Sequence, residues 1–234
     1  MSLSPGFNLL VNACATIGLQ LLAFIIASCF HIDLVTDFAG CLIFVLVALL
    51  SFFLGQGINY ASCIVPTVLV IVSKVYLGIY LLERVIRRGH DDRFNEIRDN
   101  VVAFLVFFIL QMIWVFGTSI ELILINSIVT TSTQISTSYL IAGGIVFGVG
   151  LIIQISADLH KRWFQIQNGK RDFIKTWLWS YSRHPSYFGE MLMVWGVWII
   201  GFPIYQTEWY NVAIISPIVT MLLLLCVSGV PRSS

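Results

Sequence analysis

Residues 177–190 read WLWSYSRHPSYFGE, and they join a basic loop to an apolar run. Arg183 and His184 place hydrogen-bond donors at the mouth of a helix, where anions are favoured. Tyr187 stands where aromatic side chains favour the membrane interface. Glu190 then falls just inside the hydrocarbon, where an ionisable group is costly and by default a functional candidate. The residues alone leave two interpretations open, an interfacial anchor or a functional site.

The composition around this stretch is that of a polytopic membrane protein. Of 234 residues, 58% are hydrophobic and only 11% are charged, which is outside the range of a soluble globular domain. The net charge of +1 indicates no nucleic-acid partner. The 5 cysteines are scattered without a C-x-x-C pair or metal-ligand spacing, so we expect neither a disulfide framework nor a metal site.

Seven apolar runs are candidates to cross a bilayer. They lie near residues 7–30, 38–54, 61–83, 101–126, 138–158, 187–202 and 210–230. The connecting loops are too short for a soluble domain. The sequence therefore predicts an all-α polytopic membrane helix bundle of about seven transmembrane helices, in a single domain over residues 1–234.

The basic residues predict the orientation of these spans. Of the 13 Lys and Arg residues, five lie in the third loop and six in the fifth, while the second, fourth and sixth loops hold none. Cytoplasmic loops carry the excess of Lys and Arg. We therefore expect cytoplasmic loops at residues 84–100 and 159–186, and an N-terminus on the outer side.

Two charged residues fall within predicted spans. Lys74 lies in the third span and Glu121 in the fourth. A charge at that depth is costly unless it is paired or faces water. Glu121 is a possible partner for Lys74, and snorkelling of the lysine towards the interface is the alternative.

The fifth span contains the glycine-rich segment AGGIVFGVG at residues 142–150. No strand precedes it, so a nucleotide-binding glycine motif is disfavoured. Gly144 and Gly148 form a small-xxx-small pair, which predicts close packing against another helix.

The same span ends in a polar face. Gln154, Asp158 and Arg162 recur at intervals of four residues and so share one side of a helix. They contribute either to a cofactor site or to a charged helix end with an Asp158–Arg162 pair. Farther along, Lys170 and Arg171 suit either a phosphate or an anionic membrane surface.

The segment RHPSYFGE at residues 183–190 resembles the signature S-R-H-P-N-Y-x-G-E of the steroid 5α-reductase C-terminal-like membrane proteins. C14-type sterol reductases and isoprenylcysteine carboxyl methyltransferases carry related segments. The resemblance extends over residues 37–230 and is strongest over residues 158–196. It implies a helical membrane protein with NADPH as cofactor.

The resemblance also implies residue roles. Tyr76 precedes Gly89 by the interval that separates a functional tyrosine from a glycine in steroid 5α-reductases, so Tyr76 is expected to donate a hydrogen bond to the substrate carbonyl. The residues expected to contact the cofactor are Arg87, His90, Gln154, Asp158, Arg162, Lys170, Arg171, Arg183, His184, Tyr187 and Glu190.

Three departures from the family pattern bear on activity. Trp177 stands where the family usually has Gly, and Ser186 stands where it usually has Asn. The chain ends soon after Pro231, where relatives continue into a basic tail that helps close the cofactor site. We expect this form to fold, and to bind the cofactor weakly if the tail is truncated.

The sequence therefore predicts an NADPH-dependent membrane reductase of a C=C bond in a hydrophobic, sterol-like or enone substrate. The alternatives are an S-adenosylmethionine-dependent methyltransferase of the isoprenylcysteine type and a catalytically weakened protein of the same fold. The expected location is the endoplasmic reticulum membrane in a eukaryote or the inner membrane in a bacterium. The oligomeric state is left open.

Overall fold

The computed structural model describes residues 3–30, 36–55, 60–88, 100–128, 135–168, 174–206 and 209–227, and all regular secondary structure within these ranges is helical. The helices are α1 (Pro5–Phe30), α2 (Thr36–Leu54), α3 (Ala61–Arg88), α4 (Val101–Ile128), α5 (Thr137–Asn168), α6 (Leu178–Tyr181), α7 (Pro185–Tyr205) and α8 (Ile215–Leu222). A 3₁₀ turn over Tyr210–Ile214 precedes α8, and a π-helical turn over Leu223–Val227 follows it.

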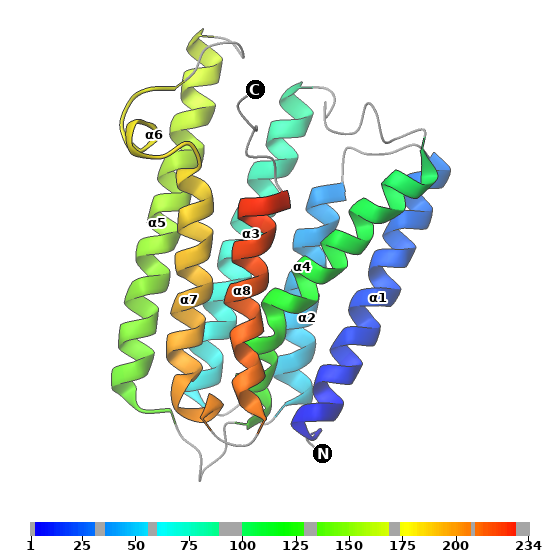
Figure 1. Ribbon diagram of the computed structural model, residues 1–234, viewed down its shortest axis with the longest axis vertical. Helices are drawn as coiled ribbons and strands as arrows, with labels where there is room; N and C mark the ends of the chain where they lie inside the picture. Colours follow the sequence, from blue (N-terminus) through cyan, green and yellow to red (C-terminus); the bar gives the residue numbers. More distant parts are fainter. Residues whose placement is uncertain are drawn as a thin grey trace.

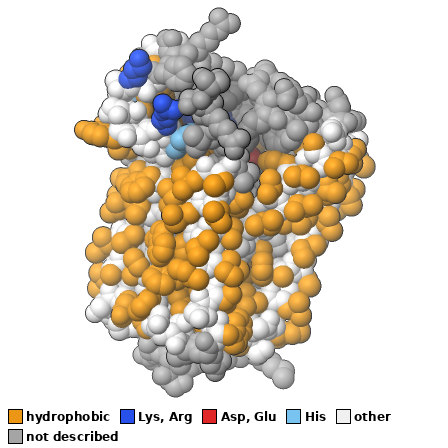
Figure 2. All heavy atoms as spheres, in the orientation of Figure 1, with side chains coloured by type: hydrophobic (Ala, Val, Ile, Leu, Met, Phe, Trp, Pro, Cys, Tyr) orange, Lys and Arg blue, Asp and Glu red, His pale blue; other side chains and the backbone are white. Residues whose placement is uncertain are grey.

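The predicted all-α membrane bundle is confirmed. In the part of the chain that the structure describes, 6 helices are long and apolar enough to cross a bilayer, and Tyr210–Cys226 forms a shorter apolar helix. Figure 2 shows hydrophobic side chains along the flanks of the bundle, with Lys and Arg gathered near one end. The protein is therefore a multi-pass integral membrane protein whose outer surface contacts lipid.

Two helices run beyond the apolar runs that predicted them. The third predicted span ends at residue 83 and the fifth at residue 158, whereas α3 continues to Arg88 and α5 to Asn168. Hydropathy marks where the hydrocarbon ends, and it places no limit on a helix that continues into water. The extensions of α3 and α5 carry charged residues at the same end of the bundle (Figure 1).

Figure 1 places the C-terminal ends of α3 and α5 at one end of the bundle, together with the last described turn after α8, while α1 begins at the other end. The described parts of the two Lys- and Arg-rich segments therefore lie at the same end, as their spacing predicts. Which side of the membrane this charged end faces stays a prediction from the positive-inside rule.

Helices α5 and α7 lie side by side along their length (Figure 1). Glycines bring their backbones into contact, because a Cβ on Gly189 would lie 2.5 Å from the carbonyl oxygen of Gly150. The prediction that Gly144 and Gly148 make the close contact is wrong, since neither has a neighbour within 4 Å of its Cβ position. These two lie on another face of α5, because each residue rotates the helix by about 100°.

Candidate functional site

Asp158 lies at the centre of the charged end, on α5. It is 5% exposed, and its Oδ1 accepts a hydrogen bond of 2.6 Å from the hydroxyl of Ser186 in the first turn of α7. The close contact of α5 and α7 brings these two residues together. Ser186 was noted in the sequence only as a departure from a family pattern, so the structure adds it to the site.

Tyr76 of α3 faces Asp158 from a third helix. Its hydroxyl is buried and lies close to the Asp158 carboxylate, although the two do not form a hydrogen bond of standard geometry. Its ring stacks on Tyr80 at 6.3 Å between centroids. The structure thus brings the predicted catalytic tyrosine to the predicted polar face of α5.

Gln154 lies one turn before Asp158 on the same face of α5. It is 2% exposed, and its Oε1 has no hydrogen-bond partner. Buried polar atoms in native proteins nearly always have partners. The unpaired Oε1 of Gln154 therefore marks, beside the buried Asp158 carboxylate and the Tyr76 hydroxyl, a place where a polar ligand group could be bound.

Arg162 and Arg87 both contact Glu83, a residue that no sequence pattern singled out. The Nε of Arg162 lies 3.0 Å from Glu83 Oε1, and the Nε of Arg87 lies 3.3 Å from the same atom. The alternative of an Asp158–Arg162 pair within α5 is not realised among the described residues. Glu83 is available to Arg162 because the extensions of α3 and α5 lie together.

The segment before α7 presents Arg183 and His184, and the first turn of α7 presents Tyr187. Arg183 is exposed, and the ring of His184 stacks on Tyr187 at 4.9 Å between centroids. Burial lowers the pKa of His184, and the cations of Lys161 and Arg183 lower it further. An anion bound here would oppose that shift, because it stabilises the imidazolium form.

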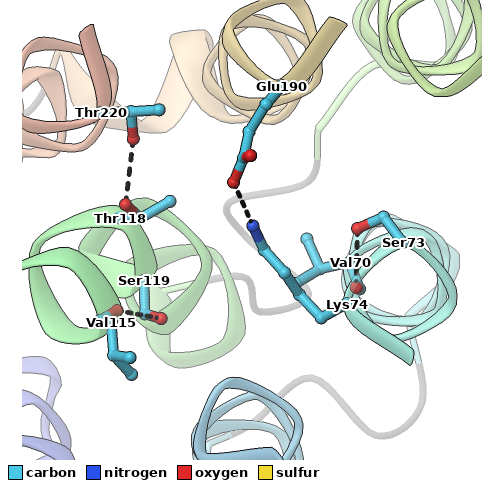
Figure 3. Close-up of polar contacts among 8 residues, drawn as sticks. All are labelled: Val70, Ser73, Lys74, Val115, Thr118, Ser119, Glu190 and Thr220. Atoms are coloured by element: carbon cyan, nitrogen blue, oxygen red, sulfur yellow. Dashed lines mark hydrogen bonds and ion pairs between the residues drawn. The ribbon is translucent and has the colours of Figure 1, made fainter. Parts of the chain in front are cut away.

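Glu190 pairs with Lys74 in the interior of the bundle. The Nζ of Lys74 lies 2.8 Å from Glu190 Oε1, and both side chains are less than a tenth exposed, at 7% and 6%. Figure 3 shows the two side chains pointing towards each other from α3 and α7. The predicted pairing of Lys74 with Glu121 is therefore wrong, and so is snorkelling, because the ammonium is turned inward.

Some predicted site residues lie outside the described ranges. These are His90 in the third loop and Lys170 and Arg171 in the fifth, together with the chain after Val227. The described residues contain no group of three or more His, Cys, Asp or Glu that could hold a metal ion.

The charged end of α3, α5 and α7 therefore combines a buried carboxylate, orphaned hydrogen-bonding atoms and a basic rim. A family model with the description "Protein of unknown function (DUF1295)" matches residues 23–234. No curated protein matches the chain. No solved structure matches it.

Proposed function

This chain belongs to the family described as "Protein of unknown function (DUF1295)", and we propose that it is an NADPH-dependent membrane reductase. The proposed reaction reduces a carbon–carbon double bond conjugated to a carbonyl in a lipid-like, sterol-like or enone substrate. The observation that carries the proposal is the buried hydroxyl of Tyr76 close to the buried carboxylate of Asp158.

The backbone at Trp177 supports the resemblance to steroid 5α-reductase-like proteins. Trp177 has φ 55, and it is the only non-glycine residue with a positive φ in the described part of the chain. Such a conformation favours glycine, which is the residue that the resembled family usually has at this position. The chain has thus kept a loop conformation suited to glycine while replacing the glycine itself.

The residues at the charged end fit a phosphorylated dinucleotide. The side chain of Arg162 is 43% exposed although it pairs with Glu83, and Arg183 is exposed as well. Exposed arginines can bind phosphate oxygens in a bidentate manner. Gln154 offers an unpaired amide oxygen to an amide or hydroxyl donor. The carboxylate of Glu190 is already paired, so a cofactor contact would have to share it with Lys74.

In the proposed mechanism bound NADPH would supply a hydride for the β-carbon of the enone, and the α-carbon would take up a proton that comes from solvent, so that the double bond gains two hydrogens. Tyr76 donates its hydroxyl proton in a hydrogen bond to the substrate carbonyl and so polarises the double bond. Asp158 lies beside that hydroxyl and is itself held by Ser186, which positions the donor. Burial of these groups excludes water and strengthens their electrostatic effect.

A hydrophobic substrate is consistent with where the tyrosine lies. Tyr76 belongs to a helix that is long and apolar enough to cross the membrane, so a lipid-like substrate could approach it from the bilayer. Separate from Tyr76, an open groove of about 340 Å³ lies between α1, α4 and α8, lined by residues that include Ile17, Phe116 and Ile120. Such a lining suits a hydrocarbon chain.

Two variants test the tyrosine. With purified protein and a panel of enones, Tyr76→Phe should leave NADPH binding intact and reduce NADPH oxidation about 10²–10⁴-fold, the usual contribution of a positioned proton donor. Tyr80→Phe is the matched control, because it removes a hydroxyl one turn away on the same helix. Equal turnover by wild type and Tyr76→Phe would reject the assigned role.

The cofactor is tested separately by direct binding. Arg183→Ala should weaken NADPH binding about ten-fold or more, the scale of one lost charge-assisted contact. Binding of S-adenosylmethionine without binding of NADPH would reject the reductase and favour the methyltransferase alternative, which the related R-H-P-x-Y segments suggested.

A further inference from the structure

A small cavity lies inside the bundle, between α2, α3, α4, α5 and α7, with a volume of about 30 Å³. Its polar lining consists of Ser73, Lys74, Thr118, Ser119, Glu121 and Glu190. This volume is enough for one water molecule, and a buried water requires two to four polar partners. The lining supplies more polar groups than a water molecule needs, so we expect the cavity to hold water.

The charges on the cavity wall do not balance if all three ionisable groups are charged. Lys74 is the only cation among the described residues that line the cavity, whereas Glu121 and Glu190 are both acids. Lys74 forms its ion pair with Glu190 at 2.8 Å. Its Nζ also lies 4.5 Å from the centroid of the Phe44 ring and 5.1 Å from that of Trp114. Both rings favour a charged lysine.

Glu121 is the acid left without a cation. It is 2% exposed, and its Oε2 has no hydrogen-bond partner. The titratable groups near it on packed helices are Lys74 of α3 and, on α7, Glu190 and Tyr205, whose hydroxyl donates to the Glu121 backbone oxygen at 3.0 Å. On α8, Ser216 Oγ accepts from the Glu121 backbone N–H at 3.1 Å. An uncompensated carboxylate in this setting would cost several kcal/mol.

The hydroxyl groups on the wall are oriented to accept hydrogen bonds. Ser73 donates its proton to the Val70 carbonyl at 2.8 Å, and Ser119 donates to the Val115 carbonyl at 2.7 Å (Figure 3). Their oxygen lone pairs therefore remain available. A water in the cavity can donate to these oxygens while it accepts from an acid O–H or from the ammonium.

We propose that this cavity is an intramembrane proton-binding site, in which Glu121 carries the proton and one water molecule connects its carboxyl group to the Lys74–Glu190 pair. The ligands are thus a proton and a water molecule. The site is neutral overall, which allows it to persist in the middle of a membrane-spanning bundle. The proposal does not depend on the reductase activity, because it concerns only the protonation state of named carboxyl groups.

Infrared spectroscopy of the purified protein in lipid nanodiscs tests the proposal, because a protonated carboxylic acid has a carbonyl band separate from that of a carboxylate. At mildly alkaline pH the wild type should show the band of one protonated acid. Glu121→Gln should remove it. Glu83→Gln is the control, since Glu83 is paired with arginines at the charged end, and this variant should keep the band.

Two further variants use the charge balance. Lys74→Met removes the cation, so both acids should be protonated and the band should double. Glu190→Gln leaves Lys74 beside Glu121 as the remaining acid, so Glu121 should ionise and the band should disappear. If Glu121 only packed in the core and did not hold a proton, neither the doubled band in Lys74→Met nor the lost band in Glu190→Gln would be expected. Size-exclusion chromatography and thermal unfolding identify any variant that fails to fold. The variants that do fold still show how many carboxyl groups in the cavity are protonated.

Exchange into D₂O tests the water. A shift of the Glu121 band after exchange supports contact with a mobile water, whereas a band that does not shift means a dry cavity and overturns that part of the proposal. Absence of any protonated-acid band in the folded wild type, or its persistence in Glu121→Gln, overturns the assignment of the proton to Glu121.

Discussion

Replacing Lys74 with Met should destabilise the fold by an amount that depends on pH. The Lys74–Glu190 pair is almost fully buried, at 7% and 6% exposure of the side chains. Without the ammonium, Glu190 must take up a proton to remain in the interior. Protonating a carboxyl group of ordinary pKa near 4.3 at pH 7 costs about 3.7 kcal/mol. This agrees with the loss of about 3–5 kcal/mol when one partner of a buried ion pair is removed.

The sign of the pH dependence follows from proton binding. The folded variant holds a proton on Glu190 that the folded wild type does not hold, and the unfolded chain at pH 7 does not bind it either. The deficit relative to wild type should therefore grow as the pH rises, by about 1.4 kcal/mol per pH unit, and should shrink to about 1 kcal/mol at pH 5.

Unfolding in mixed detergent micelles at several pH values measures this deficit. The double variant Lys74→Met/Glu190→Gln is the control, because it removes both charges and should lie within about 1 kcal/mol of wild type. A deficit for Lys74→Met that is below about 1 kcal/mol and independent of pH would refute the reasoning, since it would mean that the ion pair carries no buried charge.

Three further outcomes are expected. Gly189→Ala should lower the free energy of unfolding by about 1–3 kcal/mol, because its Cβ meets the backbone of α5. Gly148→Ala, the control, should leave it unchanged. Equal effects of the two variants on the unfolding midpoint would contradict the assigned contact. In a cysteine-free background, Ser136→Cys should react with impermeant thiol reagents from outside and Ser182→Cys only from the cytoplasm, and the reverse pattern would reject the orientation. Because burial and nearby cations lower the pKa of His184, the unfolded chain binds a proton there more readily, so the free energy of unfolding should decrease as the pH falls below about 6.5. His184→Gln should remove that decrease, and an unchanged profile would exclude His184 as its source.

The spans could be predicted from the sequence because membrane insertion depends on local composition. A stretch of apolar residues must cross the hydrocarbon as a helix, whatever its neighbours, since no water is present to satisfy its backbone. The alignment of Gln154 and Asp158 on one face is equally local, because it follows from the helical repeat. The bundle, its helix order and the polar face of α5 were therefore accessible without the structure.

The tertiary structure decided which side chains meet. Lys74 had an acid available on more than one helix, and it pairs with Glu190 rather than Glu121 because of how α3 and α7 are rotated about their axes. In the same way Arg162 pairs with Glu83 across two helices instead of within its own helix. A hydropathy window contains no information on helix rotation or on which helices are neighbours. Those quantities arise from packing, in particular from the glycine contacts that bring the backbones of α5 and α7 together.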